Sequence, residues 1–154
     1  MLPSTSNRVP EHTADHINER ILRQTRMNVS HVATEGSEAI DRRLIELDYE
    51  WDIERTLEAN AATFSLIGLA LGATVNRKWF MLSGAVAAFL LQHALQGWCP
   101  PLPVFRRMGI RTSREIDYER YALKALRGDF DDIPSPGRAG DGARTRKLFE
   151  AVES

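Results

Sequence analysis

The chain has 154 residues, of which 27% are charged, and a formal net charge of −1, so its averages exclude a strongly basic or strongly acidic protein. Its single cysteine excludes an intrachain disulfide framework and a CxxC zinc site. The charge is nevertheless segregated along the chain. Residues 35–58 hold nine acidic and three basic residues, residues 77–127 hold nine basic and three acidic residues, and only Arg77 and Lys78 are charged between residues 59 and 105.

Residues 1–34 mix Ser, Thr, Asn, His and Arg with few apolar residues, which predicts a flexible N-terminal tail with at most a transient helix. The beginning of this tail lacks the apolar stretch of a secretory signal peptide. Any insertion into a membrane is therefore expected from an internal segment.

An acidic amphipathic helix is predicted over residues 35–58. Apolar residues recur there at helical spacing, with acidic residues between them: Ile40, Leu44, Leu47 and Trp51. No Gly or Pro separates this helix from the apolar segment that follows. A continuous helix is therefore expected to run from one into the other.

Two apolar segments follow, at residues 59–76 and 79–96. The first would span about 27 Å as a helix at 1.5 Å per residue, and a bilayer core of about 30 Å needs about 20 mostly apolar residues. In a soluble hairpin these helices would need cover that two amphipathic helices and two polar tails do not provide. The sequence therefore predicts an all-α membrane protein, with a two-helix transmembrane hairpin flanked by amphipathic cytoplasmic helices.

The ends of the second apolar segment carry aromatic and basic residues. Trp79 and Trp98 lie where interfacial anchors are expected, and Arg106 and Arg107 follow as further anchors. More basic residues flank the hairpin than lie in its short loop at residues 76–78. The positive-inside rule therefore predicts that the chain crosses the membrane twice and that both termini are cytoplasmic.

A second amphipathic helix is predicted over residues 112–128. Thr112 and Glu115 have the spacing of a capping box, and Gly128 suits the position just after a helix C-terminus. Basic residues lie near the C-terminal end of this helix, where their charge interacts favourably with the helix dipole. We expect this helix either to dock on the acidic helix of residues 35–58 or to leave both faces solvated.

The remaining segments are connections. Residues 97–111 form an exit segment in which Pro100 and Pro101 end the preceding helix. Residues 129–154 are rich in turn-forming residues, which predicts a flexible C-terminal tail with a short helix near residues 144–152.

Strips of small residues occur on both apolar segments. Gly68 and Gly72 form a GxxxG pattern on the first, and Gly84 and Ala88 repeat small-xxx-small on the second. Such strips let helix backbones approach closely in lipid. The strips predict packing between the two helices of the hairpin or formation of a homodimer. Both can hold if one strip packs inside the hairpin and the other packs against a second chain.

Three stretches resemble the YgaP-like inner-membrane domain family: "DIERTLE" (52–58), "GLALG" (68–72) and "GWCPPLPVFRRMGIRT" (97–112). The resemblance covers about residues 52–112, and the Cys-Pro exit is its most specific part. It implies a small protein of the bacterial inner membrane with two transmembrane helices. Members are tied in places to rhodanese sulfurtransferase domains, and the isolated domain has no established activity.

Cys99 is the one candidate thiol. Arg106 and Arg107 favour a thiolate there, whereas its place at a helix C-terminus disfavours an anion. The alternative is a small residue that ends a helix. No catalytic residue is therefore assigned, and Cys99 is kept as a minority candidate.

His93, with Gln92 and Gln96, gives the second apolar segment a polar end. In an antiparallel hairpin Thr63 and Asn60 lie level with Gln92 and Gln96, and interhelical hydrogen bonds are the expected role. A metal site built from His93, Cys99 and Met108 lacks a regular ligand spacing. The sequence thus predicts no metal and no cofactor.

The function predicted from these features is a membrane-anchored interaction module without catalysis. Its expected partners are the lipid bilayer, a second copy of the chain and a cytoplasmic protein, and a nucleic acid is not expected because the arginines are few and border the membrane. The alternative function is a sulfur or redox relay in which Cys99 accepts sulfur or oxidant from a separate enzyme.

Overall fold

The computed structural model describes residues 4, 7–131, 133 and 141–153, and every regular element within these ranges is a helix. The all-α class is therefore confirmed. The chain divides into two compact units. Unit 1 comprises Met1–Gln24 and Glu50–Ile116, and unit 2 comprises Thr25–Tyr49 and Asp117–Ser154.

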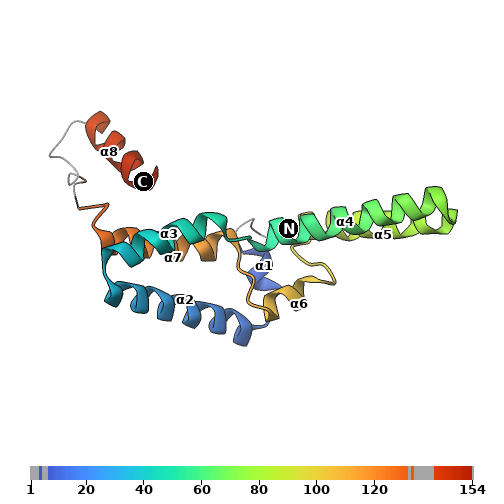
Figure 1. Cartoon of the computed structure of the whole chain (residues 1–154), viewed down its shortest axis with the longest axis horizontal. Helices are drawn as coiled ribbons and strands as arrows, with labels where there is room; N and C mark the ends of the chain where they lie inside the picture. Colours follow the sequence, from blue (N-terminus) through green and yellow to red (C-terminus); the bar gives the residue numbers. More distant parts are fainter. Residues whose placement is uncertain (1–3, 5–6, 132, 134–140, 154) are drawn as a thin grey trace. The chain divides into compact units, whose positions relative to one another are not determined.

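Unit 1 contains a helical hairpin made of α4 (Ile53–Thr74) and α5 (Phe80–Gln96). The two helices run antiparallel side by side (Figure 1). A 3₁₀ turn, Arg77–Trp79, joins them. The turn is capped by Asn76, whose side-chain oxygen accepts a hydrogen bond from the Lys78 N–H at 2.9 Å. Among the described helices, one, Arg77–Gln96, is long and apolar enough to cross a membrane.

Small residues bring the two helices of the hairpin together. Gly68 lies against Ser83 and the backbone of Trp79, and Gly72 lies against the ring of Phe80. A Cβ would lie 2.5 Å from Ser83 Oγ at Gly68 and 2.6 Å from Phe80 Cδ1 at Gly72. Ser83 also donates a hydrogen bond to the carbonyl oxygen of Ser65 at 2.8 Å. The strip on α4 therefore packs inside the hairpin.

The open end of the hairpin, called here the base, is covered by two short helices, α1 (Arg8–Glu11) and α6 (Leu102–Arg107). Five buried residues form the core of the base: Val9, Ile53, Leu57, Cys99 and Leu102. Trp98, Phe105 and Ile110 are partly buried and pack against this core. The exit segment thus folds back on the hairpin as a helix.

Two predicted boundaries are wrong. Residues 1–34 are not simply a tail, because α2 (Asp15–Glu35) is a helix of 21 residues with Ile17, Ile21 and Thr25 buried at intervals of four. Likewise the acidic helix does not run on into the hairpin: α3 (Ser37–Tyr49) ends, and α4 begins after a new cap, Asp52, whose Oδ1 accepts the Arg55 N–H at 2.8 Å. A side-chain cap of this kind starts a helix as effectively as a glycine ends one.

Unit 2 pairs α3 with the later part of α7 (Ser113–Arg127) through ion pairs. Arg43 Nε lies 2.8 Å from Oε1 of Glu119, which is fully buried, and Arg127 lies 2.7 Å from Asp41. Arg120 adds a pair with Asp48 at 3.0 Å. The acidic and basic segments therefore dock within one chain.

The ends of α7 follow the predicted signals. The Thr112 N–H donates to Glu115 Oε2 at 2.8 Å and the Glu115 N–H donates to Thr112 Oγ1 at 3.2 Å, which completes the capping box. Gly128 follows the helix with a φ of 93°. In unit 2, Lys124 Nζ donates to the Val152 carbonyl oxygen at 2.6 Å, near the end of α8 (Asp141–Glu153), which satisfies a free carbonyl group of that helix.

The glycine contacts give a matched test of hairpin packing. Gly68→Ala should destabilise the hairpin by roughly 1–3 kcal/mol, the usual range for overpacking, because the added methyl group meets backbone atoms of α5. Gly84→Ala should be neutral or slightly stabilising, since nothing lies within 4 Å of a Cβ there. Thermal unfolding of both variants in detergent, followed by circular dichroism, measures the difference. Equal midpoints for the two variants would contradict the packing described here.

Candidate functional site

An ion pair joins the two helices of the hairpin at its base. His93, in the last turn of α5, lies with Nε2 2.9 Å from Glu54 Oε2 in the first turn of α4. His93 is 2% exposed. The hydrogen bond from His93 is the main reason that the pKa of Glu54 lies below its ordinary value, and Arg8 adds to this effect while burial opposes it.

Arg8 of α1 completes this contact from outside the hairpin. Its Nη2 donates to Glu54 Oε1 at 2.9 Å, and its Nη1 donates to the carbonyl oxygen of Ala94 at 3.0 Å. The close approach depends on Gly97, which ends α5 with a φ of 80°; a Cβ there would lie 2.5 Å from Arg8 Cβ. Three helices therefore meet at one carboxylate.

Cys99 lies beside this ion pair. Its side chain is buried, with 4% of the residue exposed, and it interacts with the His93 imidazole. The second ring nitrogen of His93, Nδ1, is buried and has no hydrogen-bond partner among the described residues.

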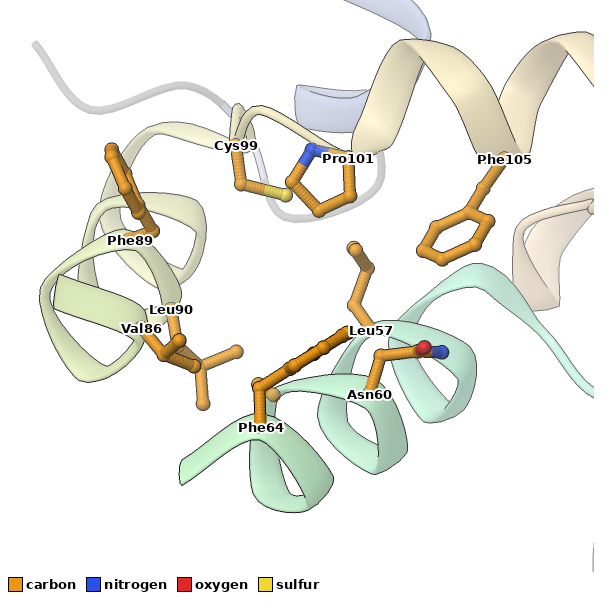
Figure 2. Close-up of a pocket in the computed structure, with 10 residues that line it drawn as sticks. Leu57, Asn60, Phe64, Val86, Phe89, Leu90, Cys99, Pro101 and Phe105 are labelled. Atoms are coloured by element: carbon orange, nitrogen blue, oxygen red, sulfur yellow. The ribbon is translucent and has the colours of Figure 1, made fainter. Parts of the chain in front are cut away.

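An apolar cavity of about 220 Å³ opens next to Cys99. Figure 2 shows the Cys99 sulfur directed toward the space between α4, α5 and the start of α6. Apart from Cys99 and Asn60, the lining side chains are apolar: Leu57, Ala61, Phe64, Val86, Phe89, Leu90, Pro101 and Phe105. The Asn60 amide donates to the Thr56 carbonyl oxygen in its own helix at 2.8 Å, so the cavity presents one sulfur atom to an otherwise apolar space.

A second polar cluster surrounds Arg106, which is fully buried. Its Nη1 and Nη2 donate to both oxygens of Glu115 at 2.7 and 2.8 Å, and Nη2 also donates to Asn18 Oδ1 at 2.9 Å. Burial opposes ionisation of Glu115, but Arg106 and the hydrogen bonds of Thr112 together outweigh it and hold the pKa of that carboxyl below its ordinary value. This cluster ties α6 to α2 and to the beginning of α7 within unit 1.

The other predicted site residues are spread over unit 1. Trp79 is 43% exposed at the tip of the hairpin, whereas Trp98 packs on the core of the base. Gly84 and Ala88 are exposed on α5, so their strip is available to another surface. Arg107 is exposed, unlike Arg106.

The interhelical hydrogen bond at this polar end joins His93 to Glu54, and Thr63 and Asn60 bond within their own helix instead. Thr63 Oγ1 donates to the Ala59 carbonyl oxygen and Asn60 donates to Thr56, both within α4. Glu54 takes that role. Sequence reasoning missed it because Glu54 was assigned to a continuous acidic helix, in which one more carboxylate gave no signal. Among the described residues, no group of three or more His, Cys, Asp and Glu side chains is placed to hold a metal ion.

Comparison with known proteins found no matching family model, no matching curated protein and no matching solved structure. The resemblance to the YgaP-like inner-membrane domain family therefore stays a prediction.

Two adjacent arginines give the sharpest test of the base. Arg106→Ala removes a fully buried side chain and the partner of the half-buried Glu115, which should cost about 2–4 kcal/mol, somewhat less than the loss of one member of a fully buried pair. Arg107→Ala should change the free energy of unfolding by less than about 0.5 kcal/mol, since the side chain is exposed. Chemical denaturation in detergent measures both variants. A loss of similar size in the two variants would show that the cluster does not stabilise the base.

The depressed pKa of Glu54 predicts a loss of stability in acid. A carboxyl whose pKa is lowered by folding stabilises the fold above its ordinary value of 4.5, and this stabilisation disappears as the pH falls through the folded-state pKa. Glu54→Gln should be less stable near neutral pH by about 1–3 kcal/mol and should lose less stability between neutral pH and acid. Unfolding midpoints measured from pH 7 to pH 3 test this, and parallel curves for the two proteins would rule out a contribution of Glu54.

Proposed function

We propose that the chain is a membrane-anchored interaction module whose hairpin, α4 and α5, inserts into a bilayer while the remaining helices stay in water. The observation that carries the proposal is the exposure of large apolar side chains all along the hairpin: Phe64, Leu66, Ile67, Leu69, Phe80, Met81, Phe89, Leu91 and Leu95. Soluble proteins rarely expose an apolar patch of that extent, and a bilayer is the environment in which it is stable.

The dimensions of the hairpin support insertion. Arg77–Gln96 has 20 residues, or about 30 Å at 1.5 Å per residue, which is the thickness of a bilayer core. Only 6% of its apolar stretch is buried by the rest of the chain, whereas the core helix of a soluble protein is mostly buried. The α4 helix accompanies it over the same span, with no charged residue between Ala59 and Thr74.

Charge at the two ends supports a two-pass arrangement with both termini in the cytoplasm. Two basic residues, Arg77 and Lys78, lie at the tip, whereas four arginines follow the hairpin on the side of the base: Arg106, Arg107, Arg111 and Arg114. Basic residues favour the cytoplasmic side in short flanking segments. In a bacterium the membrane concerned is the inner membrane, in keeping with the sequence resemblance.

Unit 2 supplies the surface for a protein partner. Ile45 and Tyr49 lie four residues apart on α3 and are 60% and 78% exposed, and Tyr118 and Tyr121 are 50% and 42% exposed on α7. Tyrosine is enriched at protein interfaces because it is both apolar and able to form hydrogen bonds. Replacing Tyr49 and Tyr121 by serine should release a partner that co-purifies with the wild-type chain from membranes; unchanged co-purification would contradict this surface.

A relay through Cys99 is the second candidate function. The interaction of the thiol with His93 favours it. The burial of Cys99 disfavours a relay. A separate donor protein must reach the sulfur, and only 4% of the Cys99 residue is exposed. The interaction module is therefore preferred.

Membrane insertion is tested by extracting membranes with alkaline carbonate. The full-length chain should remain in the pellet, because a hairpin of two apolar helices is not held by charge alone. A variant with Leu66 and Leu91 replaced by lysine should move to the supernatant, since each lysine costs about 2.5–3.5 kcal/mol at the centre of a transmembrane helix. Recovery of the unaltered chain in the supernatant would disprove insertion.

Orientation is tested by labelling introduced cysteines in a Cys99→Ser background. Lys78→Cys at the tip should react with an impermeant maleimide added to the outside of intact spheroplasts. Arg107→Cys at the base should react only after the spheroplasts are permeabilised. The reverse pattern would place the termini outside, and labelling of both positions from one side would show that the hairpin does not cross.

A further inference from the structure

The first two turns of α4 carry two charged side chains that the rest of the described chain does not neutralise. Arg55 and Glu58 are exposed, and neither forms an ion pair or a side-chain hydrogen bond with another described residue. The neighbouring carboxylates are already engaged. Asp52 accepts the backbone N–H of Arg55 at 2.8 Å, and Glu54 belongs to the ion pairs of the base. Arg55 and Glu58 can therefore bind charged groups from outside the chain.

Trp51 holds the guanidinium group of Arg55 in place. The central carbon of this group lies 4.3 Å from the centre of the indole ring, which is a cation–π contact. Residues three positions apart on a helix lie about 5–6 Å apart, yet Arg55 stacks on Trp51 and does not pair with Glu58. Stacking leaves the N–H groups at the edge of the guanidinium available to an acceptor. Trp51 is itself 49% exposed, as is common for a tryptophan at a membrane interface.

Arg55 begins the face of α4 that points toward lipid in the proposed arrangement. Ala62 and Leu66 follow it by seven and eleven residues and are exposed, and this spacing places all three on one side of the helix. The α5 helix contacts a different side of α4, at Gly68 and Gly72. A phospholipid whose acyl chains pack on this exposed face therefore has its headgroup next to Arg55.

The depth of both charged side chains matches the headgroup layer. The uncharged part of α4 begins at Ala59, so Arg55 lies about 6 Å and Glu58 about 1.5 Å beyond it at 1.5 Å per residue. The headgroup layer extends about 5–7 Å on each side of the hydrocarbon core. Helical side chains lean toward the helix N-terminus, which for α4 points out of the proposed membrane. The charged ends of both side chains therefore reach the headgroup layer.

Phosphatidylethanolamine carries the two groups that match this pair of charges. Its phosphate accepts hydrogen bonds from the planar fork of an arginine, and its ammonium group donates hydrogen bonds to a carboxylate. Phosphatidylglycerol offers the same phosphate but no cation, so it leaves Glu58 beside a second negative charge. Phosphatidylcholine carries a quaternary ammonium group, which has no N–H to donate.

We propose that Arg55, stacked on Trp51, and Glu58 form a binding site for the headgroup of phosphatidylethanolamine, with the phosphate on Arg55 and the ammonium group on Glu58. The inference rests on the proposed function, because only an inserted hairpin brings these side chains to the headgroup layer. A lipid bound in this way holds the beginning of α4 at a fixed depth.

Native mass spectrometry of the full-length chain in a neutral detergent tests the site, with one phospholipid of matched acyl chains added at a time. The chain should bind one phosphatidylethanolamine about fivefold more tightly than phosphatidylcholine or phosphatidylglycerol, the change expected from one exposed ion pair. Equal affinities for the three lipids would overturn the proposal. Excess water-soluble glycerophosphoethanolamine should leave the lipid bound, and its displacement of the lipid would overturn the assignment to a membrane lipid.

Charge variants separate the two halves of the site. Arg55→Gln should weaken binding of both phosphatidylethanolamine and phosphatidylglycerol, because both carry the phosphate. Glu58→Lys should reverse the selectivity in favour of phosphatidylglycerol, because two cations then face the phosphate. A Glu58→Lys chain that still preferred phosphatidylethanolamine would overturn the role of Glu58.

Arg23→Gln is the matched control for Arg55→Gln. Arg23 is an exposed arginine of α2 that already lies 3.6 Å from Glu19, so its loss should leave the affinities for the three lipids unchanged. A similar loss of affinity in Arg23→Gln and Arg55→Gln would show that the arginines act only through net charge, which would overturn the site.

Carbonate extraction of the same chain from vesicles distinguishes failure of this site from failure of insertion. A chain that stays in the membrane pellet but binds the three lipids equally has an inserted hairpin without this headgroup site. Release of the chain into the supernatant would overturn insertion and the headgroup site with it.

Discussion

The contact of His93 with Glu54 and Arg8 is the interaction on which the base of the hairpin depends. It joins the end of α5, the beginning of α4 and the α1 helix through one carboxylate. Charged groups removed from water are stable only when their partners are present, and loss of one member leaves an uncompensated buried charge. This contact therefore holds the open ends of the hairpin together, next to the apolar core of the base.

The hairpin is held differently along its length and at its base. Between the helices, Gly68 and Gly72 allow close van der Waals contact, which is the main source of helix association where no water is expelled. At the base, Leu57 and Leu102 are buried in an apolar core and Arg106 is buried among polar partners, as in a water-soluble domain. Gly97 lies where the hairpin meets its base, and its lack of a side chain lets α1 approach the end of α5.

Features that depend on residues close together in the chain could be predicted from the sequence. The capping box of Thr112 and Glu115 and the closing Gly128 lie within one turn of the helix ends that they define, and the apolar segments gave the two helices of the hairpin. The pairing of Glu54 with His93 joins residues 39 positions apart, and no local pattern specifies such a partner. The α2 helix was missed because a polar composition suggested a tail, although Ile17 and Ile21 already have the spacing of a buried helical face.

Arg106 and Arg107 would act differently in the proposed insertion and in the folded chain. Basic residues bias the orientation of a membrane protein while the chain inserts, before its flanking segments fold, so both arginines count at that stage. After folding, Arg106 is fully buried against Glu115 and Arg107 remains exposed. Moving the base across the membrane would then require unfolding of a buried ion pair as well as transfer of exposed charge. In the proposed membrane arrangement the folded base therefore opposes reversal of the hairpin, because the free energy of unfolding adds to the cost of transferring its charges.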